Sequence, residues 1–150
     1  MTSNVFIPGP RRESEVPRGH GRVPAEPPSP PAGAFSLLLQ ARKVLARAEL
    51  GETTHDRYAT GYLAAVRAAH AVVVLREPDQ PRSRPISVWA LLGGAAPELG
   101  DWALLFDACS ERRAAAEAGV VQVTRHESDL MMTRAREFVG LVGRSLTVVR

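Results

Sequence analysis

The sequence contains very little cysteine and lacks the apolar segments that mark secretion or membrane insertion. Cys109 is the only cysteine, so neither an intramolecular disulfide nor a thiolate metal cluster is available. No apolar run reaches about 18 residues, which excludes a membrane-spanning helix. The first residues lack the basic start and apolar core of a signal peptide. We therefore expect a cytoplasmic protein without a membrane partner.

Recognisable catalytic motifs are also missing. The four histidines do not follow one another at the spacing of metal ligands. The pair Gly93-Gly94 is not followed by a lysine, so it does not form a phosphate-binding loop. The chain has no G-x-S-x-G turn to present a nucleophilic serine. The sequence predicts no catalytic residue, no metal site and no cofactor.

The positive charge is almost entirely arginine. Of the 19 basic residues, 18 are arginines, and Lys43 is the single lysine. Together with 22 alanines, this bias indicates a GC-rich coding sequence, so part of the high isoelectric point is compositional. The net charge of +3 permits contact with nucleic acid but does not require it.

Proline divides the chain into a tail and a domain. Residues 1–34 contain eight of the twelve prolines and four of the twelve glycines. Proline fixes the backbone angle φ and removes a hydrogen-bond donor, which disfavours both helix and central strand. We expect a disordered tail over residues 1–34 with local polyproline II character, or else a proline-rich ligand for a partner. Residues 35–150 form the folded domain.

The domain begins with two predicted helices. Ser36 is expected to cap the first helix, and Gly51 is expected to end it. The second helix is predicted from Thr53 or Thr54 to a point before Pro78. The apolar residues of the first helix recur at the spacing of one helical face, at positions 37, 38, 41, 44, 45 and 48.

A proline-rich loop over residues 77–85 separates these helices from the next two. Ser87 caps a short third helix that is expected to end at Gly93-Gly94. Pro97 stands where a helix favours its first residue, so a fourth helix is predicted from Pro97 to Gly119.

Thr124 and Glu127 have the spacing of a capping box, which predicts a fifth helix that ends near Leu146. The only strand-like segment, residues 120–123, is too short and isolated to build a sheet. Long helices joined by short turns favour antiparallel packing. The sequence therefore predicts an all-α domain, an antiparallel up-and-down bundle of four long helices and one short helix.

The second predicted helix is unusually apolar. Between Thr60 and Leu75, Arg67 and His70 are its only strongly polar side chains. A helix that is apolar all round must be buried on all sides, so it is either the central helix or is covered by a second subunit. We expect a homodimer formed through this helix. One of its faces carries only small residues, namely Gly61, Ala64, Ala68 and Ala71.

Four residues are candidates for binding a nucleotide or RNA. Arg67 and His70 lie three positions apart and so share a helix face. Arg113 lies on the apolar stripe of the fourth helix, and Arg57 lies near the start of the second. Each has a structural alternative, since Arg67 and Arg113 can pair with acids and His70 can be a hydrogen-bonded, half-buried histidine.

Three segments, taken together, resemble one known family. They are residues 56–69, Ser87 to Leu92, and Pro97 through Trp102 to Gly119. They resemble the HEPN superfamily (higher eukaryotes and prokaryotes nucleotide-binding domain), and most closely a SAV-like branch from GC-rich bacteria. The resemblance covers residues 35–146. It implies a helical bundle, frequent homodimers with the working cleft at their interface, and roles with RNA, nucleotides or RNA-processing enzymes in regulation or stress.

Nuclease members of that superfamily carry an arginine followed, four to six residues later, by a histidine. No pair here fits, because Arg67 is too close to His70 and Arg113 is too far from His126. Ribonuclease activity is therefore not carried over. The sequence predicts a non-catalytic domain that binds RNA, a nucleotide or a nucleic-acid-processing partner. The alternatives are a protein-interaction module and a ribonuclease with a displaced site at Arg67 and His70.

Overall fold

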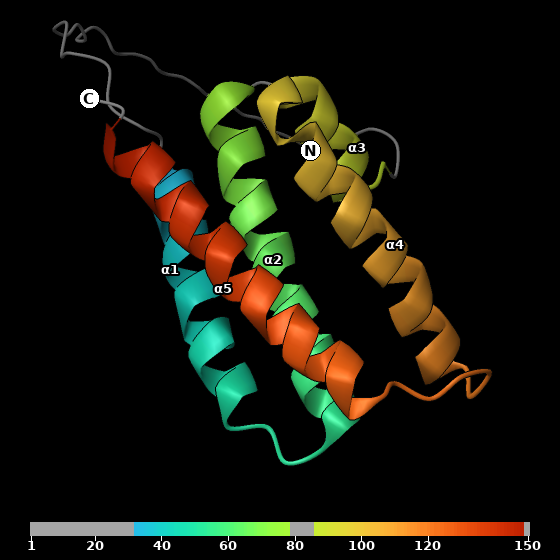
Figure 1. Ribbon diagram of the computed structural model, residues 1–150. Helices are drawn as coiled ribbons and strands as arrows, with labels where there is room; N and C mark the ends of the chain where they lie inside the picture. The colour runs from blue at the N-terminus through green and yellow to red at the C-terminus, as the bar shows by residue number, and fades with distance from the viewer. Residues whose placement is uncertain (1–31, 79–85, 149–150) are drawn as a thin grey trace, which may run out of the picture.

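The computed structural model describes residues 32–78 and 86–148, which contain five α-helices, one turn of 3-10 helix and no strand. Successive long helices run in opposite directions, as an up-and-down bundle requires (Figure 1). This arrangement confirms the predicted all-α fold. The elements are α1 (Ala32–Glu49), α2 (Thr54–Arg76), α3 (Val88–Ala95), the 3-10 turn η3 (Pro97–Leu99), α4 (Gly100–Glu117) and α5 (Arg125–Val148).

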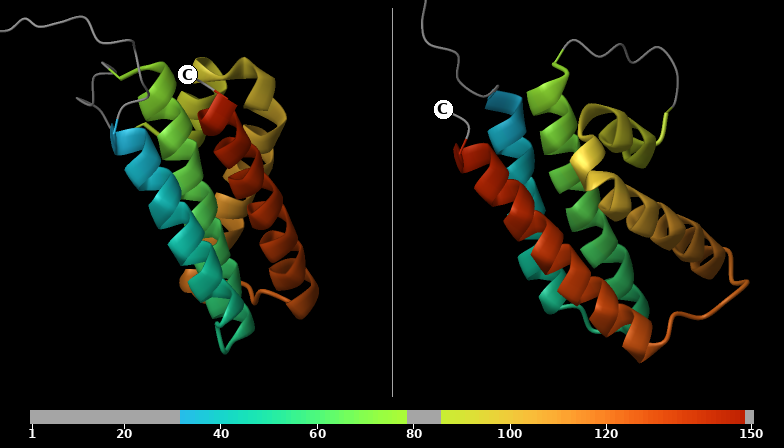
Figure 2. Two further views of the ribbon diagram at one scale, coloured as in Figure 1. Left: turned by 90° about the vertical axis from the view of Figure 1, so that its left-hand side faces the viewer. Right: turned by 45° about the horizontal axis from the view of Figure 1, so that its top comes forward.

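Helix α2 is the central helix of the bundle. Helix α1 packs along it, α5 crosses it, and α3 and α4 also contact it (Figure 2). Small residues permit this close approach: a Cβ atom added at Gly61 would lie 3.1 Å from the Met132 sulfur and 3.2 Å from Met131 Cγ. By length and composition alone α2 could cross a membrane, but 56% of its most apolar window is buried inside the bundle. Burial among the other helices therefore explains its apolar composition.

Aromatic rings from three helices form a cluster in the core. The Trp89 ring of α3 stacks on Phe106 of α4, with 5.0 Å between their centroids. The ring centroid of Phe138 of α5 lies 5.3 Å from that of Phe106 and 5.4 Å from that of Trp102. These contacts join α3, α4 and α5 where the helices lie close together, and they contribute apolar burial as well as ring packing.

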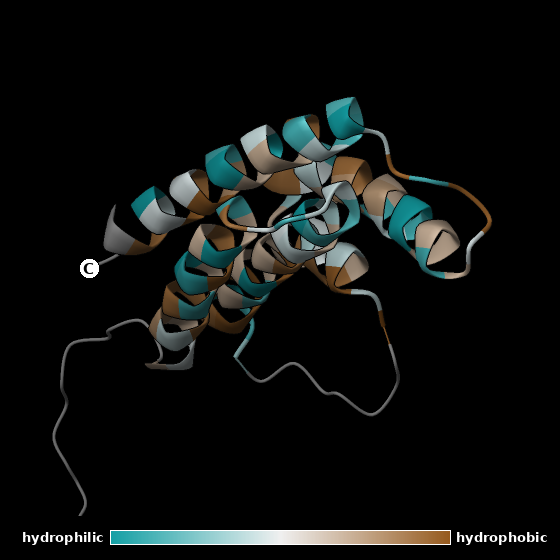
Figure 3. Cartoon of the chain, turned by 90° about the horizontal axis from the view of Figure 1, so that it is seen from below, coloured by the Kyte–Doolittle hydropathy of each residue, from teal (hydrophilic) through white to brown (hydrophobic). Residues whose placement is uncertain are grey.

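Helix α4 is the least enclosed of the long helices. Its buried residues are Ala103 and Phe106, both in its first half. Beyond them the helix leans away from α2 and α5 (Figures 1 and 2). The loop that follows carries a hydrophobic stretch on the outside of the molecule, where Val120 is 75% exposed (Figure 3). Open surfaces therefore remain on both sides of α4.

The first helix begins earlier than the sequence predicts. Helix α1 starts at Ala32, so Ser36 lies inside the helix and does not cap it. Residues 32–34, assigned from the sequence to the tail, are helical because Ala34 is fully buried in the core and extends the packed face. The disorder predicted for the rest of the tail, and most of the predicted loop over 77–85, fall outside the described residues.

The ends of the later helices also need correction. Helix α3 continues through Gly93 and Gly94 to Ala95, because its burial at Trp89 and Leu92 outweighs the weak helix propensity of glycine. Pro97 begins the 3-10 turn and not α4, which starts at Gly100.

Helix α4 ends at Glu117, two residues before Gly119, and α5 extends to Val148, two residues beyond Leu146. The predicted cap at Ser87 is confirmed by hydrogen bonds from following backbone amides, and Thr53, one of the two predicted starts of the second helix, caps α2 in the same way.

Candidate functional site

A cavity of about 620 Å³ opens between α2, α3 and α4. Much of its wall is apolar and includes Leu63 and Val66 of α2 and Val88 and Trp89 of α3. The volume falls in the range of small-molecule sites, which combine apolar walls with a few polar groups. The polar residues of the wall include His70 of α2 and three residues of α4, namely Asp107, Ser110 and Arg113.

Arg113 is the cation of this cavity, and its position is fixed. Its guanidinium carbon lies 5.3 Å from the centroid of the Tyr62 ring, a cation–π distance. It also forms an ion pair with Glu117, one helical turn further along α4. Its Nε atom is buried, and it has no hydrogen-bond partner within the part of the chain that the structure describes. Arg113 therefore retains one desolvated donor that nothing among these residues satisfies.

The hydroxyl group of Tyr62, whose ring contacts the Arg113 guanidinium, is held by a hydrogen bond from the core. The indole N–H of Trp89 donates a hydrogen bond of 2.9 Å to the Tyr62 hydroxyl, and both side chains are buried. Trp89 is held in turn by Ser87, whose hydroxyl accepts from the backbone amides at the start of α3. The core thus orients the ring on which the guanidinium rests.

The structure brings together two of the four predicted site residues. His70 and Arg113 line the same cavity from different helices. Arg67 lies nearly one turn before His70 on α2 and is not part of the wall. Arg57 lies near the start of α2, where its Nη1 atom donates to Asp129 of α5 at 2.8 Å. That hydrogen bond lowers the pKa of Asp129, and it ties α2 to α5.

Asp107 and Ser110 belong to the cavity wall but were not predicted as site residues. With Arg113 they follow a spacing of three residues, which places all three on one face of α4. This spacing is visible in the sequence. The sequence does not show that this face of α4 borders a cavity, because that depends on the packing of α3 against α4.

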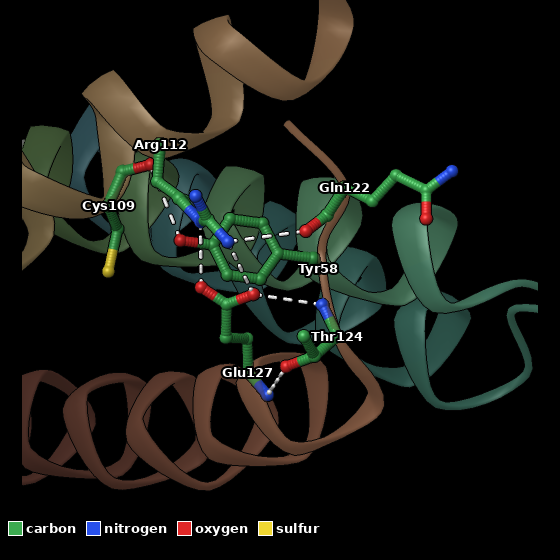
Figure 4. Close-up of polar contacts among 6 residues, drawn as sticks. All are labelled: Tyr58, Cys109, Arg112, Gln122, Thr124 and Glu127. Atoms are coloured by element: carbon green, nitrogen blue, oxygen red, sulfur yellow. Dashed lines mark hydrogen bonds and ion pairs between the residues drawn. The ribbon is translucent and has the colours of Figure 1, made fainter. Parts of the chain in front are cut away.

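A second polar cluster joins the end of α4 to the start of α5 (Figure 4). Arg112 donates to both carboxylate oxygens of Glu127, from Nε at 2.7 Å and from Nη2 at 3.0 Å. Its Nη2 atom also donates to the backbone carbonyl of Gln122 at 3.2 Å. This two-point contact is the strong geometry for an arginine–carboxylate pair.

Glu127 also completes the predicted capping box. Its carboxylate accepts from the Thr124 amide at 2.8 Å, and its own amide donates to the Thr124 hydroxyl at 3.0 Å. The hydrogen bond from Arg112, followed by that from the Thr124 amide, lowers the pKa of Glu127 to about 2. The carboxylate is therefore a charged structural anchor at neutral pH.

Tyr58 and Cys109 lie beside this cluster. The Tyr58 hydroxyl donates to the backbone carbonyl of Cys109 at 3.5 Å, the long limit of a hydrogen bond. Burial raises the pKa of both the Tyr58 hydroxyl and the Cys109 thiol. Both groups are protonated at neutral pH, so Cys109 is a weak nucleophile. No group of three or more metal-ligating side chains occurs within residues 32–78 and 86–148.

Comparison with known proteins identifies a family. The chain matches the family described as SAV_6107-like HEPN over residues 48–143, from the end of α1 through most of α5. No curated protein matches the chain. No solved structure matches it either. The family match spans well over half of the chain and includes the whole cavity between α2, α3 and α4. The chain therefore belongs to the SAV_6107-like HEPN family.

Proposed function

We propose that this domain binds a phosphate-bearing ligand, a nucleotide or one nucleotide of a single-stranded RNA, in the cavity between α2, α3 and α4. The observation that carries the proposal is the state of Arg113. Its guanidinium is oriented on Tyr62 and has a buried Nε donor without a partner among the described residues. Arginine donors in a fixed, partly desolvated position suit a phosphate oxygen.

The remaining wall fits the other parts of a nucleotide. Asp107 and Ser110 offer acceptors for ribose hydroxyls or base amino groups, and His70 adds a further polar contact. Leu63 and Val66 of α2 and Val88 of α3 supply apolar surface for a base. Inorganic phosphate alone suits the cavity less well, because Asp107 and Glu117 are both negative.

We further propose that binding is not coupled to cleavage. The arginine–histidine spacing of the nuclease members is absent from the sequence. The displaced pair considered above, Arg67 with His70, does not supply both groups to one cavity, since only His70 lines it. General acid–base cleavage of RNA needs a proton acceptor and charge relief at the same phosphate.

The test is fluorescence anisotropy of a labelled single-stranded RNA, measured at several salt concentrations. Wild-type protein is expected to bind, with an affinity that falls as salt rises, because phosphate contacts release counterions. Arg113→Gln is expected to weaken binding about tenfold, the cost of one charge-assisted hydrogen bond. Arg125→Gln removes the same charge from an exposed position on α5, outside this cavity, and should bind nearly as wild type.

Two results would overturn the proposal. Equal affinities of the two variants would show that Arg113 is not the phosphate contact, and absence of binding at low salt would remove the nucleic-acid function altogether. The same samples are run on a denaturing gel. Cleaved RNA would contradict the non-catalytic part of the proposal while leaving the binding part intact.

Protein association is a second candidate function, favoured by the surface of α3 and α4. Leu104 is 72% exposed beside a shallow apolar cavity of about 490 Å³ lined by Ala90, Gly93 and Ala103. The small-residue face of α2 already packs inside the bundle, so we propose that a homodimer uses the α3–α4 surface. Light scattering should give twice the monomer mass, and Leu104→Asp should give the monomer. Monomeric wild-type protein at tens of micromolar, about the range of weak association, would contradict it.

A further inference from the structure

The opposite side of α4 carries another cavity, between α4 and α5. Its volume is about 360 Å³, and a second hollow of about 280 Å³ shares Leu105 and Arg134 with it. We call the two together the α4–α5 groove. It differs from the proposed nucleotide cavity in every lining residue, because it faces the other side of α4.

Apolar side chains form most of the larger cavity. Leu105 and Ala108 contribute from α4, and Leu130 and Met131 contribute from α5. Met131 is buried, whereas Ala108 is exposed at the rim. The groove therefore has an apolar floor that is open to a ligand from one side.

Two arginines line the groove, Arg112 and Arg134, and among the described residues only Arg112 forms an ion pair. Arg112 is neutralised by its two hydrogen bonds to Glu127. Arg134 is half-buried, and no carboxylate lies within ion-pair distance of it in the part of the chain that is described. Its neighbour Arg136, two residues along α5, is paired with Glu49 at 3.1 Å. Arg134 is thus a partly desolvated cation that forms no direct ion pair within the described residues, although Asp101 and Glu137 line the same hollow.

We propose that the α4–α5 groove binds a small monocarboxylate with an apolar body. The planar guanidinium of Arg134 would donate two parallel hydrogen bonds to the carboxylate, and the apolar body would lie on Leu105, Leu130 and Met131. A single negative charge is favoured over a phosphate dianion, because Asp101, Glu127 and Glu137 also line the groove and would repel a second charge.

The test uses octanoate, an aliphatic monocarboxylate, titrated into the full chain by isothermal titration calorimetry below its micelle-forming concentration. Binding with a one-to-one stoichiometry is expected for wild type. 1-Octanol, which has the same chain without the charge, should bind at least tenfold more weakly. Equal binding of octanoate and octanol would show that only apolar surface is recognised, and it would overturn the proposal.

Variants of single residues test whether octanoate binds in the α4–α5 groove. Arg134→Gln should weaken octanoate binding about tenfold, whereas Arg125→Gln, the same change at an exposed position of the same helix, should leave it unchanged. Ala108→Phe fills the rim at an exposed residue that the core does not need, and it should block binding even though Arg134 is intact. Full affinity in either Arg134→Gln or Ala108→Phe, or no octanoate binding by wild type, would reject the groove as the site.

The outcome is independent of the nucleotide proposal. Arg113→Gln lies outside the groove and should bind octanoate as wild type does. Conversely, a loss of octanoate binding in Arg134→Gln says nothing about RNA. The two cavities can therefore be accepted or rejected separately.

Discussion

The guanidinium carbon of Arg113 lies 5.3 Å from the centroid of the Tyr62 ring, and this contact joins α4 to α2 at the wall of the proposed nucleotide cavity. Tyr62 is held by the Trp89 indole, which belongs to the aromatic core. A side chain that faces the cavity is thus oriented by buried groups. Such preorganisation lowers the entropy cost of ligand binding, because the arginine has few alternative conformations to lose.

Glu117 is expected to compete with the ligand for Arg113, since the two form an ion pair. Glu117→Gln should therefore strengthen RNA binding several-fold at low salt, as measured by anisotropy. Glu111→Gln removes another exposed carboxylate of α4 and controls for net charge. The same gain in both variants would mean that bulk electrostatics acts and that the Arg113–Glu117 pair has no particular role.

The two buried tyrosines are expected to differ in the importance of their hydroxyl groups. Tyr62→Phe leaves the Trp89 indole N–H, in a side chain only 4% exposed, without an acceptor, which should cost about 1–3 kcal/mol. Tyr58→Phe removes only the long 3.5 Å contact with the Cys109 carbonyl and should cost less than about 1 kcal/mol. Urea denaturation of both variants tests the order, and a larger loss in Tyr58→Phe would contradict it.

The Arg112–Glu127 pair predicts a dependence of stability on pH. The pKa of Glu127 is about 2 in the folded protein, below its ordinary value of 4.5. As the pH falls below about 4.5, the unfolded chain takes up a proton that the folded chain does not, so the free energy of unfolding falls until the pH reaches about 2. The stabilisation is fully present above that window.

Glu127→Gln is therefore expected to show a shallower loss of stability between pH 5 and pH 2 than wild type, roughly the window that linkage assigns to a depressed carboxylate pKa. At pH 7 it should lower Tm by about 2–4 °C, a small effect because both partners are about one third exposed and screened by water. Glu111→Gln is the matched control. Parallel pH profiles of Glu127→Gln and wild type would exclude this contribution.

Two exposed glycines are expected to respond oppositely to alanine. Gly119 has a positive φ of 81°, and the amide of Val120 donates to the Ala115 carbonyl across it, which closes α4. Gly119→Ala should cost about 1 kcal/mol, since alanine is strained at that angle. Gly94 lies in α3 with open space around it, so Gly94→Ala should stabilise by about 0.5–1 kcal/mol. Thermal unfolding of the two variants tests whether Gly119→Ala lowers the stability and Gly94→Ala raises it.

Local signals in the sequence predicted the start of three helices well, whereas Ser36, the expected cap of the first helix, lies inside α1 because packing of Ala34 extends that helix toward its N-terminus. Thr53, Ser87 and the Thr124–Glu127 box all act as expected, because a cap needs only a side-chain oxygen near the first free amides. Helix ends were predicted less well. Gly93 and Gly94 remain helical because tertiary packing of α3 outweighs a propensity of only about 1 kcal/mol per glycine.

The candidate site shows a similar division. The helical spacing identified His70 as a polar residue on an otherwise apolar helix and Arg113 as a charged residue on the apolar stripe of the next long helix, and both line one cavity. Asp107 and Ser110 could be found only once α3 was known to pack beside α4. Arg57 and Arg113 each form an ion pair, but Arg57 pairs with Asp129 of α5, 72 positions away, and only Arg113 lines the cavity.

The amino-acid order alone therefore determined the all-α class, the family and the starts of α2, α3 and α5, because periodicity, caps and motif order are local properties of the chain. Tertiary structure decided which faces of α2 are enclosed, which arginines are neutralised, and where α4 leaves open surface. Those outcomes depend on contacts between residues far apart in sequence. Arg112 and Arg134 illustrate this, because both reach the same groove and only the fold shows that Glu127 pairs with Arg112 and not with Arg134.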